Sequence, residues 1–269
     1  MRLLLPSQSN TSSLEVGLAD SGVAVSNESA PHDLQLHKPL KDWLEQSFGR
    51  SFTVVATDLE CAEDDLLPIE RHTYQGLGAP RRKTSWIKGR KALKMLCSSI
   101  VNQPAGFFFQ GNIDTGLIPF PHPRISITHS GNLAIAVYLE DTETASDKTP
   151  LICGIGIDYQ VFRPIRNRSW RMFLTVDEQA WVSSQPEPEI PKELIRLWTI
   201  KEALYKANPA NNGTRYVDYH LVSPEQSQGD CVFKGTQERR LQYASIPFEE
   251  GYLSLALALS EVIQPEASL

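Results

Sequence analysis

Trp198–Lys206 has the sequence WTIKEALYK and lies inside a predicted helix that runs from Lys192 to Asn208. An earlier predicted helix, Arg81 to Val101, contains the similar stretch Trp86–Lys94, WIKGRKALK. Two predicted strands repeat in the same order around these helices: Ser51–Glu60 (SFTVVATDLE) resembles Leu151–Gln160 (LICGIGIDYQ), and Gly131–Val137 (GNLAIAV) resembles Gly251–Leu257 (GYLSLAL).

Three matches in the same order predict a duplicated unit of strand, helix and strand. The expected fold is therefore α+β, with two pseudo-symmetric lobes from an internal duplication and an active site in the cleft between them. The alternative is that separate strand–helix–strand segments resemble each other without common origin.

The repeat also suggests the domain organisation. Residues 1–39 are rich in Ser, Asn, Ala and Gly and are expected to form a loosely ordered N-terminal arm. Residues 40–147 would form the N-terminal lobe and 148–269 the C-terminal lobe, because the polar, turn-forming stretch Asp141–Pro150 separates them.

Composition excludes several classes of protein. The 269 residues are 41% hydrophobic, which is enough for a core, and the net charge of −6 argues against a nucleic-acid binder. No apolar run approaches the roughly 20 residues that a membrane-spanning helix needs. The apolar stretch at the start of the sequence is shorter than the one a signal peptide contains, so no signal peptide is expected. The four cysteines are far apart and fit neither a disulfide framework nor a zinc cluster. These features predict a cytoplasmic protein that binds neither nucleic acid nor membrane.

Charged side chains occupy unexpected places in the second predicted helix. Glu202 lies on the apolar stripe formed by Leu194, Trp198 and Tyr205, with Lys206 one turn further. A charge held against an apolar face requires a counter-charge, a metal or a ligand. The alternative is a surface ion pair between Glu202 and Lys206, worth about 0.2–0.5 kcal/mol. Asp158, at the end of an apolar strand, favours the functional interpretation.

The first predicted helix is strongly basic. Arg81–Lys94 contains seven Lys and Arg residues and no acid, and Arg90 lies on its apolar stripe. A solvated helix face is the usual explanation for such a run, but solvated faces normally mix both signs. The pattern predicts a site for a compact polyanion such as a nucleotide phosphate. His129, Ser130 and Gly131 follow a short strand and offer an imidazole, a hydroxyl and a backbone amide to the same ligand.

Together these segments resemble a known family. Gly156–Asp158, Phe173–Glu178 (FLTVDE) and Trp198–Lys206 look like the signature of 4′-phosphopantetheinyl transferases of the surfactin-synthetase-activating type. Trp86–Arg90 (WIKGR) and Ile127–Gly131 (ITHSG) match the N-terminal motifs of that family, and the resemblance covers roughly residues 45–260. Members have two pseudo-symmetric α+β lobes with coenzyme A between them.

The resemblance implies transfer of the 4′-phosphopantetheine of coenzyme A to a serine of an apo acyl or peptidyl carrier protein, with Mg²⁺ and release of adenosine 3′,5′-bisphosphate. This is the holo-[acyl-carrier-protein] synthase type of activity, here expected of a monomer. The implied catalytic residues are Asp158, Glu202 and Lys206; the implied metal ligands are Asp158, Glu202 and Gln160; and the implied coenzyme-binding residues are Arg82, Arg90, Thr128, His129 and Ser130.

One position departs from the usual pattern, since many members carry a second acid where this chain has Gln160. The substitution leaves open whether a third protein ligand reaches the metal. A competing hypothesis is a non-catalytic module of the same fold that only binds coenzyme A or a carrier protein. A different Mg²⁺-dependent phosphotransferase ranks last, because the chain has no Gly-x-x-x-x-Gly-Lys loop.

Overall fold

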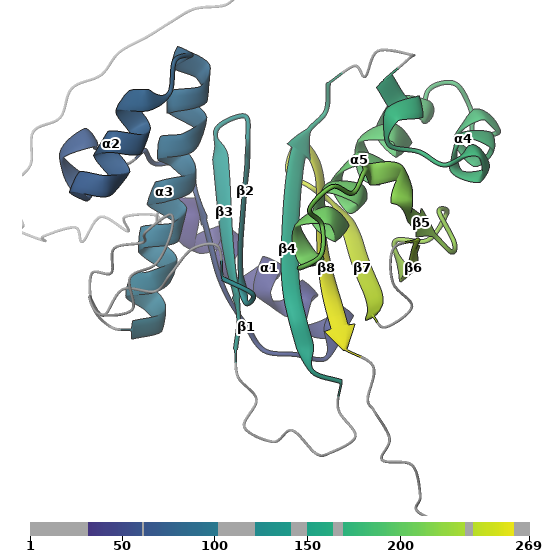
Figure 1. Ribbon diagram of the computed structural model, residues 1–269, viewed down its shortest axis with the longest axis horizontal. Coiled ribbons are helices and arrows are strands. Elements are labelled where there is room, and N and C mark those ends of the chain that lie inside the picture. The colour runs from purple at the N-terminus through teal and green to yellow at the C-terminus, as the bar shows by residue number, and fades with distance from the viewer. Residues whose placement is uncertain are drawn as a thin grey trace, which may run out of the picture. The chain divides into compact units, whose positions relative to one another are not determined.

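Helices and antiparallel strands succeed one another along the part of the chain that the computed structural model describes, which comprises residues 32–60, 62–101, 122–140, 150–163, 169–234 and 239–260 (Figure 1). The elements are α1 (His32–Phe48), β1 (Phe52–Thr57), η1 (Glu63–Asp65), α2 (Pro68–Gly76), α3 (Pro80–Val101), β2 (Ile125–Ser130), β3 (Leu133–Leu139), β4 (Ile152–Val161), η3 (Ser169–Met172), α4 (Val176–Ser183), α5 (Ile190–Ala207), η4 (Tyr216–Asp218), β5 (Tyr219–Leu221), β6 (Gln228–Phe233), β7 (Arg239–Phe248) and β8 (Gly251–Ser260).

The strands form two antiparallel sheets. The first has the order β1-β3-β2, with Val54 opposite Val137 and Ser126 opposite the same residue on the other side. The second has the order β4-β8-β7-β6-β5, and Asp158 of β4 lies opposite Ser254 of β8. β2 and β4 are therefore edge strands of their sheets, and they lie next to each other.

Each sheet has a helix on one face, and the other faces share one core. In Figure 1, α3 covers the three-stranded sheet and α5 packs against β4, β8 and β7. The shared core lies between the sheets and is closed by α1. Its buried side chains come from α1 (Leu40, Leu44), from the first sheet (Phe52, Val54, Ile135, Val137) and from the second (Ile155, Ile157, Leu253, Leu255). The predicted α+β class is confirmed.

The segments that match in sequence occupy corresponding places. β1 pairs with β3 under α3, and β4 pairs with β8 under α5. β2 lies beside β3 as β7 lies beside β8, and the second sheet is extended by β5 and β6, for which the described residues of the first sheet offer no counterpart. An origin by duplication remains a prediction.

Two predicted domain boundaries involve residues that the structure does not describe. Residues 1–31 of the predicted arm are not described, whereas 32–39 begin α1, which anchors its buried Leu40 and Leu44 in the shared core. The predicted division between lobes at 147 and 148 also lies outside the described residues. Among the helices that are described, none combines the length and the apolar character that crossing a bilayer requires.

Candidate active site

Two glycines allow α5 to lie directly on β4. A Cβ at Gly154 would come within 2.1 Å of the carbonyl oxygen of Ala207, and a Cβ at Gly156 within 2.0 Å of that of Ala203. Because side chains alternate along a strand, Asp158 faces α5 on the same side as both glycines. This close approach brings Asp158 level with the last turns of α5, where Glu202 and Lys206 lie.

Asp158 is held by contacts from two elements. Its Oδ1 accepts a hydrogen bond from Lys206 Nζ at 2.7 Å, and another from Thr128 Oγ1 of β2 at 3.1 Å. Lys206 Nζ also donates to the carbonyl oxygen of Ile157 at 3.0 Å. Since both side-chain contacts use Oδ1, Oδ2 is the oxygen that Asp158 presents to a ligand. Lys206 thus forms a partly buried ion pair with Asp158, and the alternative of a surface ion pair between Glu202 and Lys206 does not hold.

Glu202 is partly buried beside Asp158. Burial and the nearby Asp158 carboxylate raise the pKa of Glu202, while Lys206 and a hydrogen bond from Tyr216 act in the opposite direction. The Tyr216 hydroxyl donates to Glu202 Oε1 at 2.6 Å. Burial and the adjacent Glu202 raise the pKa of Tyr216 in turn, so that the phenol keeps its proton. Tyr216 was not identified from the sequence, where nothing distinguishes it from other aromatic residues near a turn.

The residues at this position fit a hard divalent cation. The carboxylates of Asp158 and Glu202 are close enough for Asp158 to raise the pKa of Glu202. A cation between them would offset the repulsion between the two negative charges. Gln160 uses its Nε2 to donate to Ser130 Oγ at 2.8 Å, and its amide oxygen remains for a ligand. Within the described residues, no group of three or more His, Cys, Asp and Glu side chains could hold a metal. A sparse set of oxygen donors suits Mg²⁺, which retains waters and substrate oxygens.

A cationic cavity of about 420 Å³ adjoins this position. Its walls come from α3, from the end of β2 and from the segment after β4, and they include Arg81, Lys88, His129, Ser130, Gln160 and Arg163. Burial is the main cause that lowers the pKa of His129, and the cation of Lys206 acts in the same direction. A neutral imidazole among three cationic side chains can donate to or accept from a phosphate oxygen.

The predicted coenzyme-binding residues divide into two groups. His129 and Ser130 line the cationic cavity, whereas Arg82, Arg90 and Thr128 do not. Arg82 is exposed, and Arg90 is only 3% exposed, with its guanidinium 4.6 Å from the centre of the Trp86 ring. Arg81 and Lys88 lie on the face of α3 that lines the cavity. They are seven positions apart in the sequence, which places them on one face of a helix, and this spacing could have identified them within the basic run.

A larger cavity, of about 790 Å³, lies on the other side of Gln160. It is lined by aromatic and apolar side chains, including Phe173 just after η3, Trp198 of α5 and Tyr216 of η4, and by Arg163, Arg171 and Arg215. Gln160 and Arg163 line both cavities, so the two cavities meet beside the candidate metal position.

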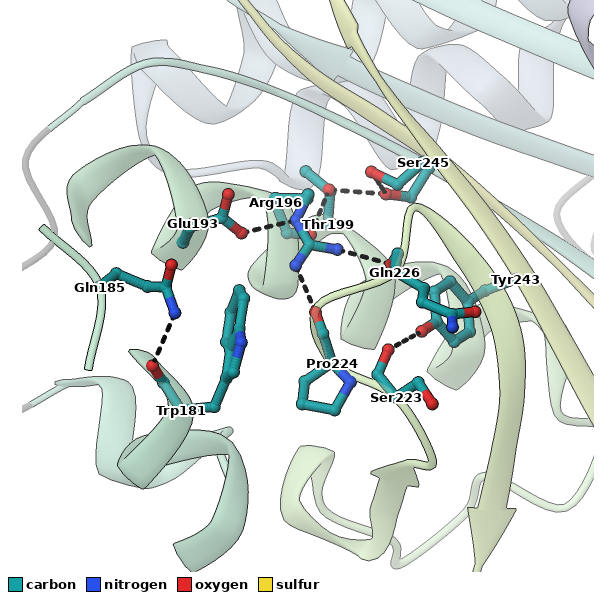
Figure 2. A network of polar contacts seen from close by, with 11 residues as sticks. Trp181, Gln185, Glu193, Arg196, Thr199, Ser223, Pro224, Gln226, Tyr243 and Ser245 are labelled. Atoms are coloured by element: carbon teal, nitrogen blue, oxygen red, sulfur yellow. Dashed lines mark hydrogen bonds and ion pairs between the residues drawn. The ribbon is translucent and has the colours of Figure 1, made fainter. Parts of the chain in front are cut away.

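Buried polar networks fix the helix that carries Glu202 and Lys206. Figure 2 shows Arg196 of α5 beside Trp181, with hydrogen bonds to Glu193 at 2.7 Å, to the Gln226 carbonyl at 2.9 Å and to the Pro224 carbonyl. Thr199 extends the network to Ser254 of β8 at 2.7 Å.

A second network lies one turn further along α5. Lys201 and Glu178 are fully buried and form an ion pair at 2.6 Å. Lys201 also donates to the Tyr219 carbonyl, and Glu178 accepts from the Leu221 amide at 2.9 Å. The Phe173–Glu178 motif thus contributes to the site by anchoring α5 rather than by lining the reaction centre.

Part of the chain matches a known protein family. Residues 154–253, from β4 to the start of β8, match the family model of the 4′-phosphopantetheinyl transferase superfamily. The match confirms the resemblance to that superfamily, and it supports phosphopantetheinyl transfer as the general activity. A search of curated proteins finds no match to the chain.

Proposed function

Because β4, α5 and β8 carry the pattern of the 4′-phosphopantetheinyl transferase superfamily, we propose that this protein transfers the 4′-phosphopantetheine of coenzyme A to a serine hydroxyl of an acyl or peptidyl carrier protein. The products are the modified carrier and adenosine 3′,5′-bisphosphate. The observation that carries the proposal is the convergence of Asp158, Glu202 and Lys206 beside the cationic cavity.

The cationic cavity is the proposed site for the phosphates of coenzyme A. Arg81 and Lys88 of α3 and Arg163 after β4 supply positive charge to the cavity wall, and His129 and Ser130 supply hydrogen-bonding groups. Charge-assisted hydrogen bonds to phosphate are shorter and stronger than neutral ones, so a few such contacts suffice to orient the coenzyme.

Asp158, Glu202 and the amide oxygen of Gln160 are the residues that would hold Mg²⁺. When bound, the ion would offset negative charge on the pyrophosphate during transfer. Gln160 brings a neutral oxygen in place of a carboxylate, so the protein alone offers only two anionic ligands. The protein would therefore depend on the pyrophosphate oxygens to complete the site.

The side chains at the centre supply proton transfer and charge stabilisation. Glu202, or a water that it orients, takes the proton of the carrier serine. The serine Oγ bonds to the phosphorus that carries pantetheine, and the bond from that phosphorus to the bridging oxygen breaks. Lys206 offsets charge on the leaving adenosine 3′,5′-bisphosphate.

Mass spectrometry of the carrier protein tests the proposal directly. The purified protein is incubated with coenzyme A, Mg²⁺ and an apo carrier protein, and the intact carrier is then weighed. We expect its mass to increase by one phosphopantetheine, and the increase to disappear when a chelator removes the metal. Binding of coenzyme A without any change in carrier mass would instead support the non-catalytic binding module.

A further inference from the structure

A row of hydroxyl groups joins the two sheets where their edge strands meet. Three alternate residues of β2, Ser126, Thr128 and Ser130, use their side-chain oxygens to accept hydrogen bonds from backbone amides of β4. The amides belong to Ile157, Tyr159 and Val161, and the distances are 3.0, 2.9 and 3.1 Å. We call this row the hydroxyl seam. It satisfies amide groups that an edge strand would otherwise leave without partners.

Thr128 differs from the other members of the hydroxyl seam in where its proton goes. A hydroxyl has one proton to donate, and Thr128 Oγ1, while accepting from the Tyr159 amide, donates to Asp158 Oδ1 at 3.1 Å. Ser130 Oγ instead accepts a second hydrogen bond, from Gln160 Nε2. Thr128 is the member that contacts the carboxylate of the proposed reaction centre.

The carboxylate of Asp158 is consequently clamped between the two sheets. Lys206 of α5 approaches Oδ1 from one side and Thr128 of β2 from the other. Thr128 is 4% exposed and Asp158 is 8% exposed, so solvent offers little substitute for either contact. Without the hydroxyl, Lys206 alone would hold Oδ1, and the carboxylate could turn further about its terminal torsion, which is intrinsically broad.

We propose that Thr128 is a positioning residue that holds Asp158 in the orientation required for phosphopantetheine transfer. The proposal rests on the proposed function and assigns Thr128 a role different from the coenzyme contact that the family resemblance implies. Its hydroxyl is engaged on both sides by β4, and its side chain does not line the cationic cavity. Thr128 therefore acts on the reaction through Asp158.

Three variants test this role. Thr128→Val removes the hydroxyl at nearly constant shape, and Thr128→Ser retains it. Ser126→Ala is the matched control, because it also removes a hydroxyl-seam acceptor but contacts no carboxylate. Loss of a group that orients a metal ligand typically costs roughly 10–100-fold in activity. We expect a kcat loss of that size in Thr128→Val only, with the KM for coenzyme A unchanged and activity restored in Thr128→Ser.

Crystal structures of the same variants test the orientation independently of activity. We expect the Asp158 carboxylate to turn away from its present position in Thr128→Val and to keep it in Ser126→Ala. If Thr128→Val does not fold, Thr128→Ala carries the same test, because it leaves room for a water at the Tyr159 amide.

Each contrary outcome has a distinct meaning. A raised KM for coenzyme A with unchanged kcat would make Thr128 a coenzyme contact and overturn the inference. An equal loss of kcat in Ser126→Ala, or an unmoved Asp158 in Thr128→Val, would also overturn it. Absence of transfer by the wild-type protein would refute the proposed function, while the crystal structures would still decide whether Thr128 orients Asp158.

Discussion

At Glu202, burial and the neighbouring Asp158 carboxylate act in the same direction on the side-chain pKa. Such a group is unfavourable for the stability of the ligand-free protein and useful to a reaction that requires a base. The cost of the Glu202 charge to stability can be measured with Glu202→Gln. This substitution keeps the shape of the side chain and an acceptor for the Tyr216 hydroxyl, and it removes the charge.

The first prediction concerns activity. We expect Glu202→Gln and Asp158→Asn to abolish transfer while leaving the fold intact, because each removes a charge that the proposed metal and the proton transfer need. Acid–base groups alone contribute about 10²–10⁴-fold to rate. Carrier modification is measured alongside Asp177→Asn, an exposed aspartate, as control. Retention of more than about a tenth of wild-type turnover in both variants, far above that range, would contradict the site assignment.

The second prediction concerns stability and pH. The pKa of Glu202 is raised in the folded chain above its usual value of 4.5, so its carboxylate is less favourable in the folded than in the unfolded state. We therefore expect Glu202→Gln to have a higher Tm than the wild type at neutral pH without ligands. The difference should shrink as the pH falls through the raised pKa of the folded chain towards 4.5, and it should vanish below 4.5, where the carboxyl is protonated in both states.

Thermal unfolding followed by circular dichroism across this pH range provides the measurement. Glu187→Gln, at an exposed position, serves as control and should leave the Tm unchanged. A wild-type protein that is more stable than Glu202→Gln at neutral pH would show that the Lys206 and Tyr216 contacts outweigh burial.

Among the elements, α3 shows how one basic helix can serve two purposes. Arg81 and Lys88 face the cationic cavity, whereas Arg90 is buried against Trp86. The sequence showed the charge but could not decide which side of the helix faces a ligand, because that depends on how α3 packs against the first sheet.

The third prediction separates these faces. We expect Arg81→Ala to raise the KM for coenzyme A by one to two decades, since a charge-assisted contact contributes roughly 1.5–3 kcal/mol. Arg82→Ala, the exposed neighbour, should leave that KM unchanged and is the matched control. Arg90→Ala should instead lower the Tm, because it removes a buried side chain packed on an aromatic ring.

Steady-state kinetics with varied coenzyme A, together with melting curves, distinguish the three arginine variants. A larger KM effect for Arg82→Ala than for Arg81→Ala would show that the cavity is not the coenzyme site.

The predictions from sequence succeeded where the signal was local. The helix expected from Lys192 to Asn208 corresponds to α5, and the short strand expected before His129 corresponds to β2, which continues to Ser130. Gly156 was part of the motif, although the sequence did not show that the close approach of α5 requires it and Gly154. The hydroxyl seam could not be predicted, because it joins β2 to a strand of the other sheet, and alternation indicates only that a face exists. Tyr216 was missed because nothing in the sequence distinguishes it from other aromatic residues near a turn, and its contact with Glu202 depends on how η4 lies against α5.

At the scale of the whole described part of the chain, α1 connects the two sheets. Leu40 and Leu44 pack in the core to which both sheets contribute. The sheets therefore stabilise each other through apolar contacts, and α1, which begins within the segment expected to be a loose arm, is part of the folded unit.

The fourth prediction tests this coupling. We expect Leu44→Ala to destabilise the protein by about 2–5 kcal/mol, the usual cost of removing a fully buried leucine side chain. Because the core is shared, unfolding should remain a single transition, and the midpoint of that transition should shift to a lower denaturant concentration in Leu44→Ala. Chemical denaturation measured by tryptophan fluorescence and by circular dichroism provides the test, with the exposed Gln46→Ala on the same helix as control. Two transitions, of which Leu44→Ala shifts only one, would show that the sheets unfold separately.

The hydroxyl seam also limits how this protein could be recombined with its relatives. A hybrid that takes the segment containing β2 from one parent and β4 from another must keep hydroxyl-bearing side chains at alternate positions of β2. Apolar residues there would leave backbone amides of β4 buried without acceptors, and they would release the Asp158 carboxylate as well. Compatible parents are thus recognised by the three positions 126, 128 and 130, whatever the similarity of their other residues.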